Sequence, residues 1–155
     1  MEIPLDESDR RLLDLLQQDA KLSVQELARG AGMSASPAWR RVRRLEEQGL
    51  IRGYVALLDP AGLGLHVAAY VHVCLLDHTE ETIRRFDEFV QREEQVLECA
   101  TITGSDDFIL RVVARDPEGL EQFLMRRLLS LGIVRSTTTN FVLRQTKMTT
   151  RLPLP

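Results

Sequence analysis

The sequence contains little cysteine and no long apolar run. Its 155 residues include 2 cysteines, Cys74 and Cys99, which are too few for a disulfide framework and predict buried thiols in a reducing compartment. No window reaches the ~18 uninterrupted apolar residues that a membrane helix needs, so we expect no membrane partner. The segment from Met1 to Arg11 lacks the basic start and the apolar stretch of a signal peptide, and a cytoplasmic location is therefore expected.

Sequence motifs of catalysis and of metal binding are also lacking. There is no phosphate-binding Gly-x-x-x-x-Gly-Lys, no Gly-x-Ser-x-Gly and no His-Glu-x-x-His. The histidines His66, His72 and His78 do not combine with the two cysteines into a compact zinc signature. We therefore predict that the protein is not an enzyme, with no catalytic residue, no metal ligand and no cofactor.

Positive charge is not in excess over the whole chain. There are 20 Lys+Arg against 23 Asp+Glu, a formal net charge of −3, which argues against a protein that binds polyanions with its entire surface. A nucleic-acid site would then have to be a local patch. Arginines that could form such a patch are concentrated between Ser34 and Arg52.

Capping signals predict three helices in the first 50 residues. Asp6 is the expected N-cap of a helix that ends near Gln18, and Ser23 with Glu26 has the spacing of a capping box. Ser34 is the expected N-cap of the third helix. The segment 50–58 that follows has the composition of an extended segment, and we place a domain boundary at about residue 60.

The third helix has the pattern of a DNA-reading helix. Burial of an apolar stripe that includes Ala38, Val42 and Leu45 would turn its arginines towards solvent, where they can bind phosphates and guanine. An ordinary solvated arginine face is the alternative, and Trp39 could pack on the domain instead of contacting DNA. The residues predicted to contact DNA are Ser34, Ser36, Pro37, Trp39, Arg40, Arg41, Arg43 and Arg44.

The second half of the chain predicts an α+β domain. Its order is strand, helix, strand, strand, helix, strand, with strands expected at 67–76, 97–103, 108–114 and 137–147 and helices at 79–94 and 117–131. This is the ferredoxin-like βαββαβ order. We therefore predict a helix-turn-helix domain over 1–60 and a ferredoxin-like domain over 61–155. Helices on one face of the sheet would leave the other face free for homodimerisation.

Several segments together resemble the Lrp/AsnC (feast/famine) transcriptional regulators, over nearly the whole chain. They are Leu5-Asp6-x-x-Asp9, Leu27-Ala28, the run from Ser34 to Glu46, Gly49-Leu50-Ile51-x-Gly53-Tyr54, Gly104-Ser105-Asp106-Asp107-Phe108, Ser136-Thr137-Thr138-Thr139 and Thr149-Thr150-x-Leu152-Pro153-Leu154. The resemblance implies a winged-helix-like DNA-binding domain, a pseudo-palindromic operator in double-stranded DNA, and homodimers that often assemble into octamers. It also implies an amino-acid effector bound between dimers.

On the family pattern, the effector site has two walls. Its residues would be Gly104, Ser105, Asp106 and Asp107 on one wall and Val134, Thr137 and Thr139 on the other. The alternative is that Gly104 and Asp107 only shape a turn and that the threonines only fill an edge strand. This sequence also departs from the family, which often has an aromatic residue in place of Asp106 and Pro-Gly in place of Gly132-Ile133.

Two other functions are compatible with the same architecture. One is an enzyme similar to the sirohaem decarboxylases, which would use side chains such as His66, His72 and Arg111. The other is a metabolite sensor that does not bind DNA. The arginine-rich third helix, which such an enzyme would not need, favours the DNA-binding regulator over the enzyme, and a salt-dependent DNA titration separates the regulator from the sensor.

Overall fold

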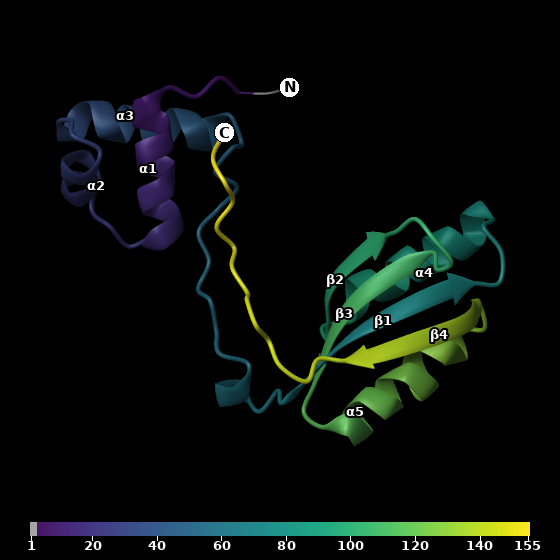
Figure 1. Ribbon diagram of the computed structural model, residues 1–155. Helices are drawn as coiled ribbons and strands as arrows, with labels where there is room; N and C mark the ends of the chain where they lie inside the picture. Colours follow the sequence, from purple (N-terminus) through teal and green to yellow (C-terminus); the bar gives the residue numbers. More distant parts are fainter. Residues whose placement is uncertain (1–2) are drawn as a thin grey trace. The chain divides into compact units, whose positions relative to one another are not determined.

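The computed structural model describes residues 3–155, which form two compact units joined by the chain (Figure 1). The helical unit extends to Leu57 and also includes Lys147–Pro155, a C-terminal segment that we call the tail. The sheet unit comprises Leu58–Thr146. The sequence-based division at residue 60 grouped the tail with the sheet, whereas in the structure the tail contacts the first helix.

The helical unit is built on α1 (Glu7–Gln18), α2 (Val24–Gly30) and α3 (Ala35–Glu47). Capping boxes start α1 and α2, because the side chains of Asp6 and Ser23 each accept a hydrogen bond from the backbone of the residue three positions later. The buried residues of the core come from all three helices and their connections: Leu12, Leu27, Ala28, Ala31 and Ala38. This core fixes α3 against α1 and α2 and leaves one side of α3 exposed.

The sheet unit has the predicted ferredoxin-like order. Its elements are β1 (Val67–Leu75), α4 (Glu80–Arg92), β2 (Val96–Thr101), β3 (Phe108–Ala114), α5 (Pro117–Gln122) and β4 (Val134–Phe141), with short 3-10 turns at Ala61–Leu63 and Leu129–Leu131 and a π-helical turn at Phe123–Leu128. The four strands pair antiparallel in the order β2-β3-β1-β4. Together with the helical unit, this confirms the predicted α+β fold.

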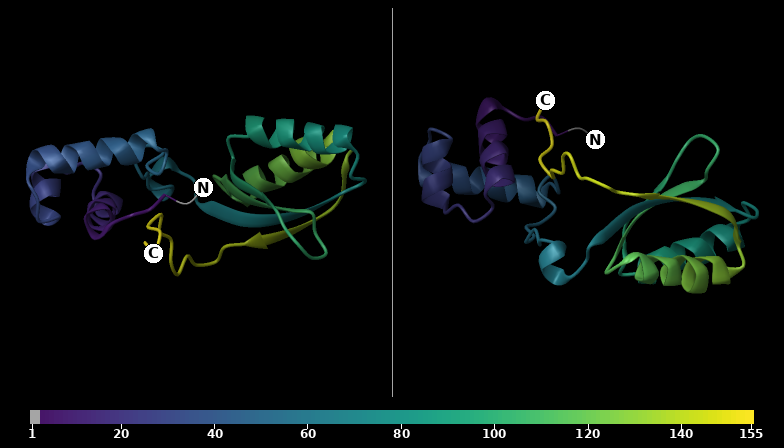
Figure 2. Two further views of the ribbon diagram at one scale, coloured as in Figure 1. Left: turned by 90° about the horizontal axis from the view of Figure 1, so that it is seen from above. Right: turned by 60° about the horizontal axis from the view of Figure 1, so that its bottom comes forward.

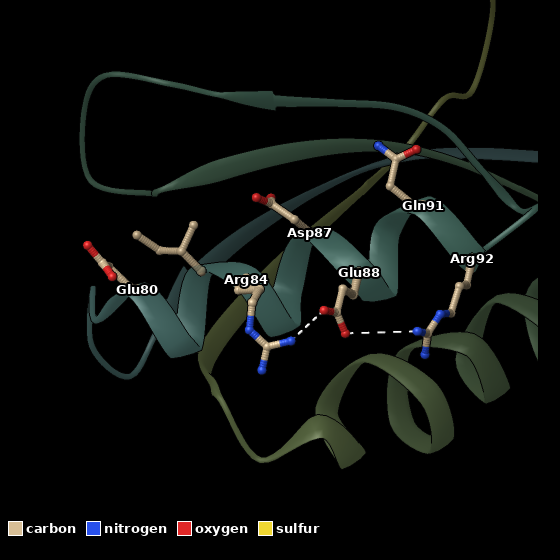
Figure 3. Close-up of a pocket in the computed structure, with 7 residues that line it drawn as sticks. Glu80, Arg84, Asp87, Glu88, Gln91 and Arg92 are labelled. Carbon is tan, nitrogen blue, oxygen red and sulfur yellow. Dashed lines mark hydrogen bonds and ion pairs between the residues drawn. The ribbon is translucent and has the colours of Figure 1, made fainter.

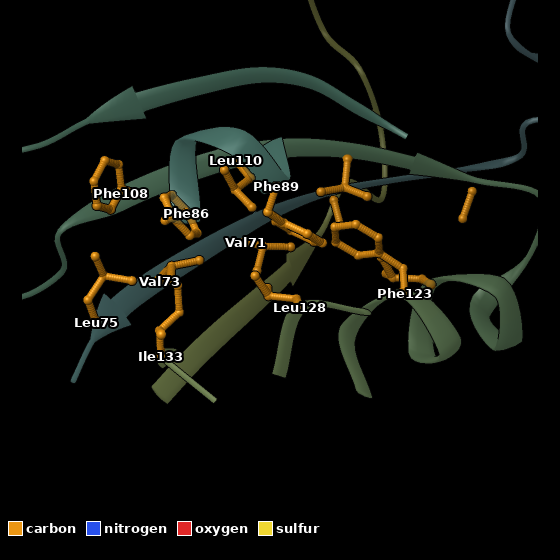
Figure 4. Close-up of a cluster of buried hydrophobic side chains, with 14 residues drawn as sticks. Val71, Val73, Leu75, Phe86, Phe89, Phe108, Leu110, Phe123, Leu128 and Ile133 are labelled. Carbon is orange, nitrogen blue, oxygen red and sulfur yellow. The ribbon is translucent and has the colours of Figure 1, made fainter. Parts of the chain in front are cut away.

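Both helices of the sheet unit lie on the same face of the sheet (Figure 2). Figure 4 shows the core that these helices form with the sheet. In it, apolar side chains of β1 and β3 contact aromatic side chains of α4 and of the segment after α5. The rings of Phe86 and Phe108 have centroids 4.6 Å apart. None of the described helices of this unit covers the opposite face, where Tyr70 is 37% exposed. This open face is the one that the sequence assigns to a homodimer.

The last strand begins and ends earlier than predicted. It was expected at 137–147 but runs from Val134 to Phe141, because Gly132 adopts a left-handed turn (φ +67°) that leads the chain directly into the strand. The predicted residues beyond Phe141 lie outside β4, and Leu143 is 96% exposed. Segment 50–58 forms no strand either, since it has no pairing partner among the described residues.

The helix predicted at 117–131 changes its winding along its length, from α to π to 3-10. It nevertheless carries its buried residues, including Leu120, Phe123 and Leu128, towards the core.

Among residues 3–155, no helix combines the length and the apolar character that a membrane crossing requires.

Candidate functional site

The two sides of α3 carry arginines with different surroundings. On the side that faces α1, the Nη1 atom of Arg41 lies 2.9 Å from Oδ1 of Asp9 and 2.6 Å from Oδ2 of Asp6. The Nη2 atom of Arg44 lies 2.6 Å from Oδ2 of Asp9. Because the Asp9 side chain is only 2% exposed, the two guanidinium groups provide the partners that a buried carboxylate requires.

These ion pairs change the assignment of two predicted DNA contacts. Hydrogen bonds to Asp6 and Asp9 raise the pKa of Arg41, while the backbone N–H of Asp9 and then Arg41 lower the pKa of Asp6. The structure therefore gives Arg41 and Arg44 a role in holding α3 on α1. Sequence analysis missed this role for Asp9, although acids three positions apart on α1 and arginines three positions apart on α3 were a visible signal.

The outward side of α3 presents the remaining polar residues. Ser36, Arg40 and Arg43 follow the helical spacing i, i+4, i+7 and are exposed. Arg40 forms no ion pair within residues 3–155, whereas Arg43 lies 3.0 Å from the carboxylate of Glu47. The hydroxyl of Ser34 makes no capping hydrogen bond, so it is available at the start of the helix. Pro37 is half-buried in the first turn.

Trp39 lies at the border of this outward side. Its ring is 51% exposed, and the guanidinium carbon of Arg43 lies 5.7 Å from the ring centroid, a cation–π distance. The same ring lines a hollow of about 220 Å³ together with Leu16 and Tyr54. Trp39 thus packs on the domain with one part and remains accessible with the other, so the structure is compatible with both sequence-based interpretations.

Tyr54 lines the same hollow and is held by a side chain of α3. Its hydroxyl donates a hydrogen bond of 2.9 Å to the carboxylate of Glu46. Burial, and then the negative charge and hydrogen bond of Glu46, raise the pKa of Tyr54 to about 12. The extended segment beyond α3 is thereby held against that helix at Tyr54 without a β-strand.

One predicted wall of the effector site is the loop between β2 and β3. Asp107 fastens this loop to the end of β1, because its carboxylate accepts a hydrogen bond of 2.7 Å from the backbone N–H of Leu75 and lies 2.8 Å from Nε2 of His78. The contact with His78, followed by the Leu75 N–H, lowers the pKa of Asp107. Gly104 has a φ of +124°, which favours glycine, at the bend of the loop.

Asp106 belongs to a small polar cluster on the open face of the sheet. The Sγ of Cys74 donates to Oδ1 of Asp106 at 3.3 Å and to the carbonyl oxygen of Ser105 at 3.4 Å. The other carboxylate oxygen of Asp106 lies 3.4 Å from Nδ1 of His72. His72, which a decarboxylase-like mechanism would use, therefore faces a carboxylate. Among the described residues no group of three or more His, Cys, Asp or Glu side chains is arranged to hold a metal ion.

The second predicted wall lies on the other side of the sheet. Thr137 pairs with Val73 and Thr139 with Val71, so both threonines project to the helix-covered side at the β4 edge. Val134 packs against the core on that side. Since the Asp106 cluster lies on the open face, the structure does not bring the two walls together within one chain.

The hollow beside α4 contains none of the predicted effector residues. It has a volume of about 510 Å³ and is lined by residues of α4 alone, Ile83 among them. Figure 3 labels its polar lining residues Glu80, Arg84, Asp87, Glu88, Gln91 and Arg92. Arg84, Glu88 and Arg92 form a row of ion pairs along this helix. Exposed pairs of this kind are common on helix surfaces and point to no ligand.

Comparison with known proteins links both units to one family. A model of the Lrp/AsnC ligand binding domain matches residues 68–152, and a model of a winged helix-turn-helix DNA-binding domain matches residues 5–52. The chain is 38% identical over 150 residues to the DNA-binding transcriptional activator DecR of Escherichia coli (strain K12), covering 97% of this chain and 99% of that protein.

Two further relatives are similar along almost their whole lengths. The leucine-responsive regulatory protein of Escherichia coli (strain K12) is 36% identical over 148 residues, covering 96% of this chain and 90% of that protein. A transcriptional regulator from Neisseria meningitidis, crystallised in complex with L-methionine, superposes with a TM-score of 0.94 at 33% identity, covering 97% of each chain. The resemblance inferred from the sequence motifs is thereby confirmed.

Proposed function

Because the chain belongs to the Lrp/AsnC family and is a DNA-binding transcriptional regulator, we propose that the outward side of α3 reads its operator. The observation that carries this proposal is the exposed row Ser36, Arg40 and Arg43, in which Arg40 has no ion-pair partner among the described residues. A free guanidinium on a helix that enters the major groove can donate two hydrogen bonds to guanine or bind a phosphate. Ser34 and Trp39 flank this row.

Arg41 and Arg44 contribute in a different way. Because their guanidinium groups contact Asp9, their main effect is to fix the direction of α3 on α1. The Arg44 side chain is still 45% exposed, so a phosphate contact at the edge of the interface is compatible with its ion pair. The proposal therefore separates residues that read DNA from residues that hold the reading helix.

The experiment that tests this proposal starts from a random pool of duplexes. Wild-type protein is used to select a sequence, and its affinity for that sequence is compared with its affinity for a scrambled duplex. Arg40→Ala should reduce the affinity for the selected duplex by about tenfold and relax its sequence preference, because one bidentate base contact is worth about 1–3 kcal/mol. Arg84→Ala on α4 serves as the control. Unchanged affinity for the selected duplex in Arg40→Ala would contradict the proposal.

We further propose that the protein works as a homodimer joined through the open face of the sheet, with octamers as the larger assembly. The half-exposed Tyr70 and the partly buried His72 lie on this face, which no helix of the sheet unit covers. A two-fold arrangement would present two copies of α3 to a pseudo-palindromic operator. Light scattering over a concentration range tests this assembly: a stable monomer would contradict it, and masses of two and eight chains would support it.

The effector that we propose is an amino acid or a close relative, bound between dimers. Two observations support this class. The Neisseria regulator was crystallised with L-methionine and another relative is named as leucine-responsive. In addition, the Asp106 and Thr137 walls lie on opposite sides of the sheet within one chain, which suits a site completed by different chains. A carboxylate such as Asp106 can bind an α-ammonium group, and threonine hydroxyls can bind polar atoms.

A thermal-shift screen against the twenty amino acids tests the effector proposal. An effector that binds the native state raises the melting temperature, and the shift grows with the logarithm of its concentration above the dissociation constant. The shift should disappear in Asp106→Ala and persist in Asp87→Ala, whose residue lies on α4 outside the proposed site. A full shift in Asp106→Ala would show that Asp106 is not part of the effector site. No shift of the melting temperature with any of the twenty compounds would contradict an amino-acid effector.

A further inference from the structure

One stripe of α1 is occupied by the tail. Arg10, Asp14 and Gln17 are spaced i, i+4, i+7, so their side chains project from the same side of the helix. Each of the three contacts a tail residue. In the described part of the helical unit, the tail is therefore held by three side chains along one side of α1 and not by one contact alone.

The contacts determine the register of the tail. The guanidinium of Arg151 reaches Oδ1 of Asp14 with Nε at 3.1 Å and Nη2 at 2.5 Å. The backbone N–H of Leu152 donates to Oε1 of Gln17 at 2.6 Å, and the carbonyl oxygen of Leu152 accepts from Nε2 of Gln17 at 3.1 Å. Arg10 donates to an oxygen of Pro155. The tail's own Thr149 hydroxyl accepts a hydrogen bond from the Arg151 backbone at 3.0 Å.

The pairing of Gln17 with Leu152 is the most specific of these contacts. A primary amide has one donor group and one acceptor, and here they meet both backbone groups of one residue, as a neighbouring strand would. A shift of the tail by one residue would break this pair. The ion pair between Arg151 and Asp14 is partly exposed, with 52% and 39% of the side chains accessible, so it contributes modestly and acts together with the amide.

The same helix also holds the reading helix. Asp9 of α1 binds Arg41 and Arg44 of α3, and Asp6, the N-cap of α1, also binds Arg41. The tail is therefore connected to α3 through one rigid element. At its other end the tail continues from β4, with only residues 142–146 between the end of that strand and the start of the tail.

Docking of the tail on α1 adds a second connection between the two units of the chain. The chain passes from the helical unit to the sheet unit after Leu57 and returns after Thr146. With the tail docked on α1, the helical unit is attached to the sheet unit at two points. With the tail released, only the connection after Leu57 would remain, and a single linker permits the attached unit to rotate.

We propose that the tail is an intramolecular tether that limits rotation of the helical unit and so pre-orients the two α3 helices of a dimer for paired half-sites. This inference rests on the proposed DNA-binding function. Binding of the second helix is an intramolecular event whose strength depends on how often the helix already points towards its half-site. The tether increases the fraction of time in which the second helix points towards its half-site. It does not change the affinity for a duplex with a single half-site.

A charge exchange across the contact tests the tether. Arg151→Asp and Asp14→Arg should each release the tail, and the double variant with both changes should dock it again. Arg144→Asp makes the same change of charge outside the docked segment and serves as the control. Tail docking is measured directly by hydrogen exchange of the Leu152 amide, which Gln17 protects in the docked state.

The functional measurement compares duplexes with one and with two half-sites. In each single variant, affinity for the two-half-site duplex should fall by about tenfold while affinity for one half-site stays the same, and the double variant should recover both affinity and amide protection. Equal affinity for two half-sites in a variant whose Leu152 amide exchanges freely would overturn the tether. An unprotected Leu152 amide in the wild type would also overturn it.

The two proposals fail in distinguishable ways. If the wild-type protein binds neither duplex while its Leu152 amide is protected, the DNA-binding function is wrong and the role of the tether in DNA recognition is wrong with it. If the wild type binds both duplexes and the charge variants bind as the wild type does, only the tether is wrong.

Discussion

Asp9 of α1 and Arg44 of α3 are joined by an ion pair of 2.6 Å, although 35 positions separate them in the sequence. Together with Arg41, this contact makes a buried carboxylate the link between the first helix and the reading helix. An arginine-rich helix is thus divided by its surroundings into a side that supports the domain and an exposed side, which is the side that we propose to contact DNA.

Asp9→Ala should destabilise the helical unit. The side chain is almost fully buried, and its removal leaves Arg41 and Arg44 facing a site that has lost its negative charge. We expect the free energy of unfolding to fall by about 3 kcal/mol, at the low end for a broken buried pair because both arginines are partly exposed. Urea denaturation measures the change. Glu7→Ala, which breaks an exposed pair with Arg11, should cost less than about 0.5 kcal/mol, and equal effects would contradict the assignment.

Asp107→Ala should loosen the loop between β2 and β3. The change leaves the backbone N–H of Leu75 without its acceptor and His78 without its partner, at an expected cost of about 1–2 kcal/mol. Since the folded pKa of Asp107 is lowered, its contribution is present above the unfolded pKa of about 4 and is lost as pH falls below it. Denaturation at pH 7 and pH 3 measures both effects. A cost that is as large at pH 3 as at pH 7 would contradict this account.

Tyr54 should titrate well above an ordinary tyrosine. Its pKa of about 12 is raised mainly by burial, so Glu46→Gln should lower it only part of the way towards 10. Because the folded pKa is the higher one, stability from the protonated phenol is present below pH 10 and is lost as pH rises towards about 12. Ultraviolet titration measures the value, with Tyr70→Phe removing the other tyrosine signal. Because Tyr54 is 48% exposed, its partial burial and its hydrogen bond to Glu46 act together, and a midpoint near 10 would contradict this account.

Trp39 provides an optical probe of the reading helix, because it is the sole tryptophan. Its ring is 51% exposed beside Arg43, so a bound duplex should change its emission. Fluorescence during titration with the selected duplex measures this change, and Arg43→Ala should alter the emission of the free protein by removing the nearby cation. Emission that stays constant while DNA binds would show that α3 is not at the interface.

Local signals in the sequence predict most of the elements. The capping box of Ser23 and Glu26 marks the start of α2, and a run of β-branched residues marks β1, because these features act over a few neighbouring residues. The end of β4 was misplaced, since Val142 and Leu143 look like strand residues and only the absence of a partner strand shows that they are not.

Contacts between distant segments could not be predicted from local patterns. In the sequence, Arg41 and Arg44 cannot be told apart from the other arginines of the third helix. Only the packing of α3 against α1 shows that both bind the carboxylate of Asp9. The docking of Leu152 on Gln17 depends likewise on the path of the chain between the two units. The effector site remains a prediction, because its two walls lie on opposite sides of the sheet of one chain.

The measurement that tests the central claim most directly is the salt dependence of DNA affinity for the wild type and Arg40→Ala. If Arg40 contacts DNA from the outward side of α3, the variant should bind the selected duplex more weakly, and the loss of one cationic group from the interface should reduce the slope of log affinity against log salt by up to about 0.9. Arg84→Ala, on α4, should follow the wild-type line. Superposable lines for Arg40→Ala and the wild type would contradict the assignment of this side of α3 to DNA.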